Sequence, residues 1–325
     1  MRVLNAADVH RLLSMQKCIE IMESAMRAVS SGSVSIPPRT FVPLIHPDDH
    51  LGLMPGSAPG LSAYGAKIIS LHRGNAVRQL PAIQGFVALF DSDTGTPVGI
   101  IDGASVTAIR TAAASGLATR VLAREDASSH GVLGTGVQAE THVEAIACAR
   151  EIDVVRVWGR DRERTQRFAA DQSRRFDFDI VAVESAADAV SCDVVSSVTG
   201  ASEPVLEGAW LSPGAHVNLV GAHTPETREA DSDALARSTV YVDLLASARA
   251  EAGDILIPMA EGRIGWGDVT GEIGQVLTGA IGGRSNVTQI TLYKSLGIVA
   301  QDLFVANYLL DQATAADAGT VVELN

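Results

Sequence analysis

Residues 131–146 read GVLGTGVQAETHVEAI, in which a short apolar run meets Gly134-Thr135-Gly136 and then a run of good helix formers. The pattern Gly-x-Gly-x-x-Ala, which ends at Ala139, is typical of a turn that holds a dinucleotide. The same pattern also occurs in an ordinary tight turn between a strand and a helix. The sequence on either side of the turn decides between these two interpretations.

The segments around this turn alternate short apolar runs with helical stretches. The apolar runs are HGVLG (130–134), VVRVWG (154–159), DIVAV (179–183), CDVVSSV (192–198), GAHVNLVG (214–221) and VYVDL (240–244), and the helical stretches begin at about 139 and cover 162–171 and 185–191. Strict alternation of strand and helix is typical of a parallel sheet with helices on both faces. The glycine turn follows the first strand and precedes the first helix, where a pyrophosphate can meet the helix N-terminus. The turn therefore predicts a dinucleotide site.

The residues before this region follow a different pattern. Up to about residue 30, apolar side chains recur as on two amphipathic helices, one around Val9 and the next around Met22. Short β-like runs then alternate with turns rich in Gly, Pro and Asp, namely TFVPLI (40–45), YGAKIISL (64–71), GFVALFD (85–91) and PVGIID (97–102). These runs predict a mostly antiparallel sheet.

The composition disfavours several classes of protein. The chain has 325 residues, 46% of them hydrophobic, and a net charge of -13, so it can bury a large core but has no general basic field for nucleic acid. The first 15 residues lack the apolar core of a signal peptide, and no stretch reaches the ~18 apolar residues of a membrane span. We therefore expect a cytoplasmic protein without nucleic-acid or membrane partners. The three cysteines and eight histidines are scattered, so we expect no metal site.

The end of the second strand of the alternating region bears on the choice of cofactor. An NAD-selective site usually places Asp or Glu there to bind the adenosine ribose. This chain has Gly159-Arg160 instead, and the guanidinium of Arg160 can bind a 2′-phosphate. Arg160 could equally be a solvated surface residue, with Asp161 in the acidic role. We expect NADP(H) to be preferred, with NAD(H) possible.

Four motifs together resemble one known family. IRTAAASG (109–116), GTGVQAE (134–140), VGAHTPETRE (220–229) and TLYKSLGIVAQD (291–302) are similar to the ornithine cyclodeaminase and mu-crystallin family, in the same order and over essentially the whole chain. The resemblance implies an α/β protein whose Rossmann-type doubly wound parallel sheet, residues 116–299, is inserted into a discontinuous α+β domain. That domain, residues 1–115 with 300–325, would bind substrate and form a homodimer.

Three cations lie in segments that otherwise have little use for charge. Arg39 stands at the entrance to a strand, Lys67 has apolar neighbours in YGAKIIS, and Arg110 lies in an Ala-rich helix. Buried cations need anionic partners, so each could be a salt-bridge residue or a surface residue whose charge reaches water. The resemblance implies instead that all three hold a substrate carboxylate and that Lys67 lies close to the reacting carbon.

His223 marks a departure from part of this family. Cyclodeaminases carry an aspartate two residues after the glycine that closes the strand HVNLVG, where it handles the substrate's side-chain amine, and an imidazole is no simple substitute. Imine-reducing members also lack this aspartate. His223 is therefore either a proton donor or a loop residue beside the cofactor. The cofactor contacts that we expect are Arg110, Thr111, Gly134, Thr135, Gly136, Val137, Gln138, Gly159, Arg160, Asp161, Val220, Ala222, Ser295 and Leu296.

The leading hypothesis is an NAD(P)H-dependent reductase of small α-imino acids, such as pyrroline-2-carboxylate or piperideine-2-carboxylate. In it Arg39, Lys67 and Arg110 bind the carboxylate, and Lys67 or His223 supplies the proton. The alternatives are cyclodeamination of ornithine or lysine with recycled NAD, an alanine-dehydrogenase-like reaction, and a nucleotide-dependent binding protein similar to mu-crystallin. An intact Lys67 argues against binding alone, since a binding protein needs no proton relay.

Overall fold

The computed structural model describes residues 1–46, 49–72, 74–75, 80–81 and 83–324. The chain divides into two compact units, one of Met1–Arg110 with Gly297–Asn325 and the other of Thr111–Leu296. The division expected from the sequence, at 115/116 and 299/300 with a substrate-binding and a nucleotide-binding part, stays a prediction. Among the described residues, no helix combines the length and apolar character that crossing a membrane requires.

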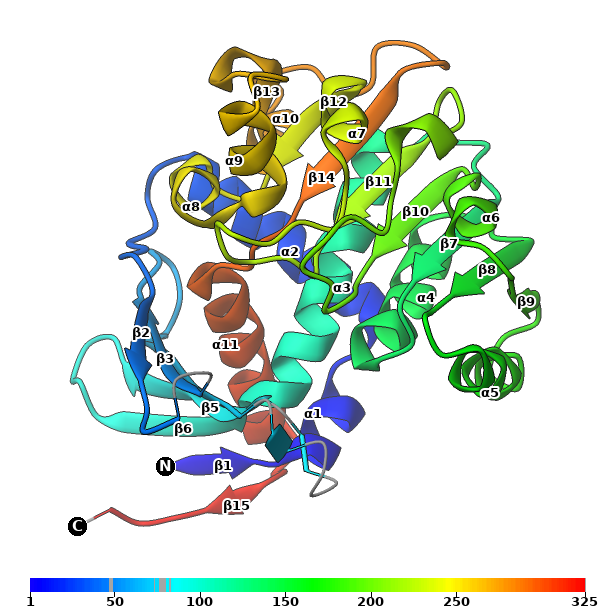
Figure 1. Ribbon diagram of the computed structural model, residues 1–325. Helices are drawn as coiled ribbons and strands as arrows, with labels where there is room; N and C mark the ends of the chain where they lie inside the picture. The colour runs from blue at the N-terminus through cyan, green and yellow to red at the C-terminus, as the bar shows by residue number, and fades with distance from the viewer. Residues whose placement is uncertain (47–48, 73, 76–79, 82, 325) are drawn as a thin grey trace. The chain divides into compact units, whose positions relative to one another are not determined.

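The second unit is built on an eight-stranded sheet in the order β13-β12-β14-β11-β10-β7-β8-β9. All its paired strands are parallel, and Figure 1 shows β14, β11, β10 and β7 side by side. The chain leaves β7 in one direction for β8 and β9 and later continues from β10 in the other, so the strand order reverses between β7 and β10. The strands are β7 (Ser129–Leu133), β8 (Val154–Trp158), β9 (Asp179–Ala182), β10 (Val194–Ser197), β11 (His216–Leu219), β12 (Ser238–Val242), β13 (Val269–Glu272) and β14 (Ile290–Lys294).

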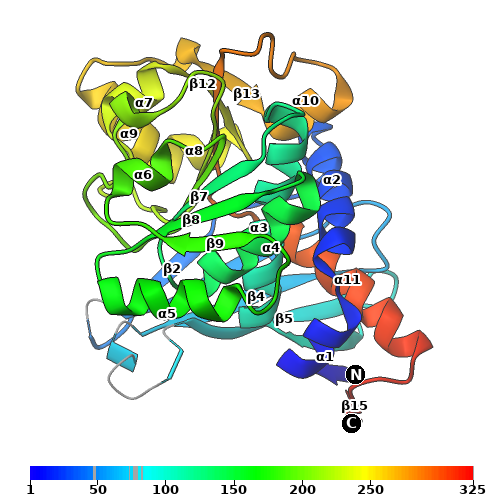
Figure 2. The same ribbon diagram turned by 90° about the vertical axis from the view of Figure 1, so that its right-hand side faces the viewer.

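Helices cover both faces of this sheet, as the alternation predicted. Neighbouring strand residues such as Val194 and Val195 belong to two different buried clusters, because successive side chains point to opposite faces. Helices α4 (Val137–Ala149) and α5 (Arg162–Gln172) contribute to one cluster, and α6 (Ala186–Val190), α7 (Ser232–Ala236), α8 (Leu245–Glu251) and α9 (Gly253–Ala260) to the other. Figure 2 shows α5 beside the edge strand β9. The short helix α10 (Ile273–Thr278) follows β13.

The alternation is not strict, which corrects one expectation. Between β10 and β11 the chain forms only the 3-10 turn η2 (Gly208–Trp210), and a second such turn, η3 (Trp266–Asp268), precedes β13. Pro204 and Pro213 lie in the β10–β11 connection. Proline has no amide hydrogen and disrupts a helix interior, which accounts for the missing helix.

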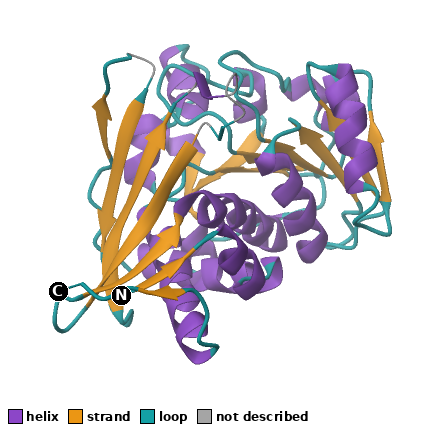
Figure 3. Ribbon diagram, turned by 90° about the horizontal axis from the view of Figure 1, so that it is seen from below, coloured by secondary structure: helices purple, strands orange, loops and turns teal. Residues whose placement is uncertain are grey.

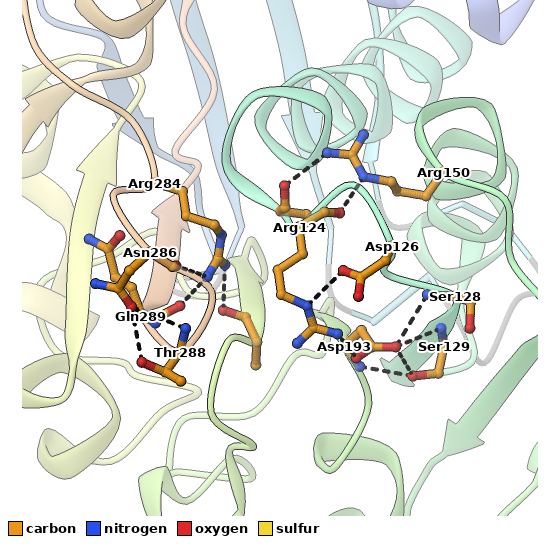
Figure 4. Close-up of polar contacts among 12 residues, drawn as sticks. Arg124, Asp126, Ser128, Ser129, Arg150, Asp193, Arg284, Asn286, Thr288 and Gln289 are labelled. Carbon is orange, nitrogen blue, oxygen red and sulfur yellow. Dashed lines mark hydrogen bonds and ion pairs between the residues drawn. The ribbon is translucent and has the colours of Figure 1, made fainter.

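A polar cluster joins the segments at the amino edge of the sheet (Figure 4). Asp193, just before β10, accepts hydrogen bonds from Arg124 Nη2 (2.7 Å), Ser129 Oγ (2.7 Å) and the amides of Ser128 (3.2 Å) and Ser129 (3.1 Å). Arg150 donates to backbone carbonyls near the end of helix α3 (Gly103–Leu122), including that of Ala123 at 2.9 Å. These charges satisfy backbone and neighbouring groups and serve the fold.

Three histidines are fully buried in this unit. Burial lowers the pKa of His130 to about 3, of His142 to about 4 and of His216 to about 3, so all three are neutral at pH 7. Each has a hydroxyl group within hydrogen-bond distance, from Ser196, Ser115 and Thr291 respectively.

The first unit is built on a seven-stranded sheet in the order β15-β1-β6-β5-β4-β3-β2. Apart from the parallel pair β1/β6, neighbouring strands are antiparallel, which confirms the predicted antiparallel character. Figure 3 shows these strands as one layer. The elements are β1 (Arg2–Leu4), α1 (Ala6–Leu12), α2 (Met15–Ser30), β2 (Thr40–Pro43), β3 (His50–Gly56), β4 (Ala63–Leu71), β5 (Ile83–Asp91), β6 (Pro97–Asp102), α11 (Val299–Ala315) and β15 (Thr320–Val321).

Helix α11 covers one face of this sheet through contacts with β3, β4 and β5, and α2 packs on α11. The strand register places Met54, Lys67, Val87 and Ile101 in one row across four strands. All four side chains are buried. The row therefore places one ammonium group among three apolar side chains beneath α11.

Candidate active site

Asp302 is the centre of a buried charged cluster in the first unit. It lies in the first turn of α11 and is fully buried. Its Oδ1 accepts hydrogen bonds from Lys67 Nζ at 3.1 Å and from Arg110 Nε at 3.0 Å. Lys67 is 2% exposed and Arg110 is 4% exposed, so solvent hardly screens these ion pairs.

Lys67 is poised to exchange a proton near neutral pH. Burial lowers the pKa of its ammonium group, Asp302 opposes this shift, and the nearby guanidinium groups of Arg110 and Arg39 lower the pKa further, to about 8. Nζ also donates to Thr107 Oγ1 at 3.1 Å. Two oxygen partners thus fix the position of an acid whose pKa lies close to working pH, which suits general acid catalysis.

The cluster has more positive than negative charge and retains unused polar atoms. Arg110 Nη1 donates to Gln301 Oε1 at 2.7 Å, and Arg39 Nη2 donates to the carbonyl of Gly297 at 3.0 Å. Lys67 and Arg110 share the one carboxylate of Asp302, and the charge of Arg39 lies close enough to lower the pKa of Lys67. Among the described residues, Asp302 Oδ2 and Gln301 Nε2 are buried atoms without a hydrogen-bond partner. Such atoms are costly in a folded chain, so they are available for a polar ligand.

Sequence reasoning missed Asp302 and Gln301 as site residues. Both lie in the motif TLYKSLGIVAQD, whose last two residues are an amide and an acid in an otherwise apolar helical stretch. That misplaced polarity was the available signal.

The glycine turn after β7 has the geometry of a phosphate-binding loop. Gly134 has a φ of 122°, and a Cβ there would approach the carbonyl oxygen of Val198 to 2.9 Å, so the fold itself requires glycine. Gly136, which caps α4, has an ordinary extended backbone, and a Cβ there would meet nothing within 4 Å. The chain has no internal need for glycine at 136, and the open space lies at the free amides of a helix N-terminus. This cradle fits a dinucleotide pyrophosphate.

The end of β8 forms a second part of this region. Arg160 is exposed and lines a cavity of about 220 Å³ together with Trp158 and Glu184. Asp161 Oδ1 accepts the amide of Arg164 at 3.0 Å and so caps α5. Asp161 is the only acidic residue in the segment 159–161. One of its two carboxylate oxygens is therefore already used by a hydrogen bond within the protein.

The loop after β11 carries His223, whose exposed ring lies with Nδ1 3.0 Å from the carbonyl of Gly221. After β14, the amide of Ser295 donates to the backbone carbonyl of Leu219 at 3.0 Å. The amide of Leu296 donates to Asp243 Oδ2 at 2.8 Å. The described residues contain no group of three or more His, Cys, Asp or Glu that could hold a metal ion.

The predicted site residues thus fall into two groups. Arg39, Lys67 and Arg110 lie together in the first unit. The expected nucleotide contacts in the second unit follow the carboxyl ends of the parallel strands β7, β8, β11 and β14, apart from Thr111, which is buried in α3 directly after Arg110. In open α/β sheets the ligand binds outside the carboxyl ends of the strands, where the strand order reverses.

Comparison with known proteins identifies relatives over the whole chain. A model of the ornithine cyclodeaminase/mu-crystallin family matches residues 1–317. The Δ1-pyrroline-2-carboxylate reductase of Bacillus cereus is 33% identical, over 99% of this chain and 100% of its own length. The ketimine reductase mu-crystallin of Mus musculus is 35% identical, over 95% of this chain and 96% of its own. The resemblance drawn from the four motifs is confirmed.

Solved structures agree with this assignment. Δ1-pyrroline-2-carboxylate reductase of Thermococcus litoralis, in complex with NADH and L-proline, superposes with a TM-score of 0.96 at 34% identity and covers 99% of this chain and 100% of its own. An archaeal alanine dehydrogenase dimer with bound NAD gives a TM-score of 0.94 at 29% identity, over 100% and 99% of the two chains. The predicted fold class is confirmed.

Proposed function

The chain belongs to the ornithine cyclodeaminase/mu-crystallin family of NAD-dependent oxidoreductases, and we propose that it reduces a small α-imino acid to the L-amino acid with NAD(P)H. The observation that carries the proposal is the pair of Lys67 and Arg110 on Asp302, with Arg39 near Lys67. Its excess positive charge suits a carboxylate, and its lysine, with a pKa of about 8, suits proton donation.

In the proposed reaction Arg39 and Arg110 bind the substrate carboxylate and hold the imine carbon in place. The reduced nicotinamide, when bound, supplies a hydride to that carbon. The ammonium of Lys67 donates the proton that the imine nitrogen requires, so the C=N bond gains one hydride and one proton. Asp302 keeps the lysine protonated until substrate arrives. His223 is the alternative proton source.

We propose that NADP(H) is preferred and that NAD(H) is also used. The support is Arg160, which is exposed beside the cavity at the end of β8, together with the capping role of the neighbouring Asp161. The two structural relatives bind NADH and NAD, without a 2′-phosphate. Any assay should therefore include NAD(H) as well as NADP(H).

Two alternatives within the family remain in competition. Alanine dehydrogenation is favoured by the similarity to the archaeal enzyme, and it needs the same carboxylate site. Cyclodeamination is disfavoured by His223, since an imidazole is no simple substitute for a carboxylate that attracts an ammonium group. Outside enzymes, a nucleotide-dependent binding protein would leave the proton-donating character of Lys67 without a purpose.

We also propose that the protein is a homodimer. Residues that alternate with the Lys67 row point away from α11, and they include Ile68 and the exposed aromatic ring of Phe86. Tyr64, 40% exposed, stacks on Phe90 on the same outward face. An apolar sheet face of this kind is typical of a subunit interface, and the archaeal alanine dehydrogenase is a dimer.

The test is a spectrophotometric screen that follows loss of NADPH and NADH absorbance with pyrroline-2-carboxylate, piperideine-2-carboxylate, and pyruvate with ammonia. We expect turnover of a cyclic or linear α-imino acid. In the same preparation, NAD with ornithine should release no ammonia and form no proline. Ammonia release at a rate comparable with imine reduction would overturn the proposal and would make His223 a working substitute for the aspartate.

A further inference from the structure

The motif VGAHTPETRE ends in Glu229, a residue that the proposed chemistry does not use. Its side chain is fully buried, and its carboxylate accepts five hydrogen bonds. Oε1 accepts from Ser197 Oγ (2.8 Å) and from the amide and hydroxyl of Thr199 (both 2.7 Å), and Oε2 accepts from the amides of Gly221 (2.5 Å) and Ala222 (3.3 Å). One carboxylate thus holds the chain after β10 and the chain after β11.

Two further buried charges hold the same region. Lys294 Nζ donates to the carbonyl of Ala222 at 2.5 Å and pairs with Asp254 Oδ2 at 2.8 Å. Asp254 Oδ1 accepts the amides of Glu229 (2.7 Å) and Ala230 (3.1 Å). The amide and the carbonyl of Ala222 are therefore both held by buried charged groups. We name Glu229, Asp254 and Lys294 the buried triad.

Burying three charged groups costs free energy, and stability alone does not require them. Burial raises the pKa of Glu229, and Asp254 raises it further, while Lys294 and the hydrogen bonds of Thr199 oppose the rise. Five donors require an acceptor-only group, so the ionised carboxylate is the form that fits. Buried charges of this kind are often no more stabilising than apolar residues of similar volume. Their many hydrogen bonds to the loops point to a role in geometry.

The packing around the triad leaves the loops little freedom. A Cβ at Gly221 would approach the carbonyl oxygen of Thr199 to 2.0 Å and the carboxyl carbon of Glu229 to 2.7 Å. The two loops therefore touch through backbone atoms, and glycine is needed at 221. His223 follows two residues later, so its backbone position is set by the same contacts.

We propose that the buried triad positions the nicotinamide half of the cofactor, with Glu229 as the main positioning residue. In a doubly wound nucleotide fold, each half of the dinucleotide is bound by one half of the sheet. The turn after β7 and the end of β8 belong to the half that binds adenosine. The loops after β10 and β11, which the triad holds, belong to the other half. The inference rests on the proposed nucleotide-dependent function.

The test compares Glu229→Gln with Asp193→Asn by fluorescence titration of the folded proteins with NADPH, NADH and ADP-ribose. Asp193 is the control, because it is a carboxylate that accepts four hydrogen bonds just before β10, whereas Glu229 holds the chain at the other end of that strand. We expect Glu229→Gln to raise the Kd of NADPH and NADH alike by about tenfold to a hundredfold, as for loss of a charged hydrogen bond. ADP-ribose, which lacks nicotinamide, should bind as in the unaltered protein. Asp193→Asn should lower the Tm and leave all three Kd values within about twofold.

A second pair of variants keeps the test decisive if Glu229→Gln does not fold. Thr199→Val removes one hydroxyl donor to Glu229, and Thr199→Ser keeps it. We expect the valine variant alone to weaken NADH binding, with ADP-ribose unaffected. Equal weakening of ADP-ribose and NADH, or no weakening of either, would overturn the inference. Failure of the unaltered protein to bind NADPH or NADH would overturn the proposed function as well.

Discussion

Replacing Asp302 by asparagine should move the pH dependence of the reaction, because this carboxylate sustains the charge of Lys67. Burial and two nearby guanidinium groups lower the pKa of Lys67 to about 8, and Asp302 at 3.1 Å is the group that raises it. For unit charges at this distance, an effective dielectric constant of ~20 implies an attraction of about 5 kcal/mol. Observed shifts from one opposite charge are smaller, about 1–3 pKa units, which correspond to about 1.4–4 kcal/mol.

We therefore expect the pKa of Lys67 in Asp302→Asn to fall to about 5–7. A proton donor must be protonated, so the rate declines as the pH rises through its pKa. The alkaline limb of kcat/KM for imine reduction, which reports the free enzyme, should move to lower pH by ~1–3 units. With a pKa of ~6, only about a tenth of the lysine is protonated at pH 7, and the rate there falls roughly tenfold.

The assay is the pH profile of kcat/KM with saturating NADPH. Asp311→Asn, an exposed position on the same helix α11, is the control and should keep the profile of the unaltered protein. If Asp302→Asn loses activity while its alkaline limb stays in place, or if the limb moves to higher pH, then Asp302 does not tune Lys67 and the reasoning is refuted.

Three further predictions concern single features. Lys67→Met should lower kcat by about 10²–10⁴, the usual contribution of a positioned acid, with cofactor Kd unchanged; near-normal turnover would make Lys67 a structural cation. Arg160→Ala should remove most of a roughly ten- to hundredfold preference for NADPH, as measured by the two Kd values, and equal affinities in the unaltered protein would contradict the premise. The buried histidines have folded pKa values below the ordinary value, so they contribute fully to the free energy of unfolding above about pH 6.5. As the pH falls below this value, the free energy of unfolding decreases by about 1.4 kcal/mol per histidine per pH unit. Urea midpoints at pH 7 and pH 5.5 measure this loss, and His142→Gln should reduce it by about a third.

Structural features that depend on residues close together in the sequence could be predicted. The alternation of apolar runs and helical stretches predicted the parallel sheet, because burial on both faces leaves a local signature in each strand. The strand β14 was harder to predict. Its residues were noticed only as part of a family motif, and its position between β11 and β12 is set by pairing with strands distant in the chain.

The charged clusters could be predicted only in part. A cation in an apolar segment is unusual, which draws attention to Lys67 and Arg110, but only the family resemblance makes them site residues. Their shared partner Asp302 lies 235 residues beyond Lys67. Glu229 likewise holds Thr199, thirty residues earlier, through contacts that leave no periodic pattern. Local sequence shows which charge needs a partner, and only the folded chain shows which residue provides it.

At the two glycines of the turn after β7, a substitution that raises thermal stability can weaken the proposed cofactor binding. Gly134 does not tolerate substitution, since its positive φ and the nearby carbonyl of Val198 would strain any side chain. Gly136 is an N-cap in open space, and serine is a better helix cap than glycine, so Gly136→Ser should make the empty protein slightly more heat-resistant. The same side chain would enter the open space where we propose that the pyrophosphate binds. Under the proposed function, a library ranked by melting temperature alone would therefore enrich a variant that binds its coenzyme poorly.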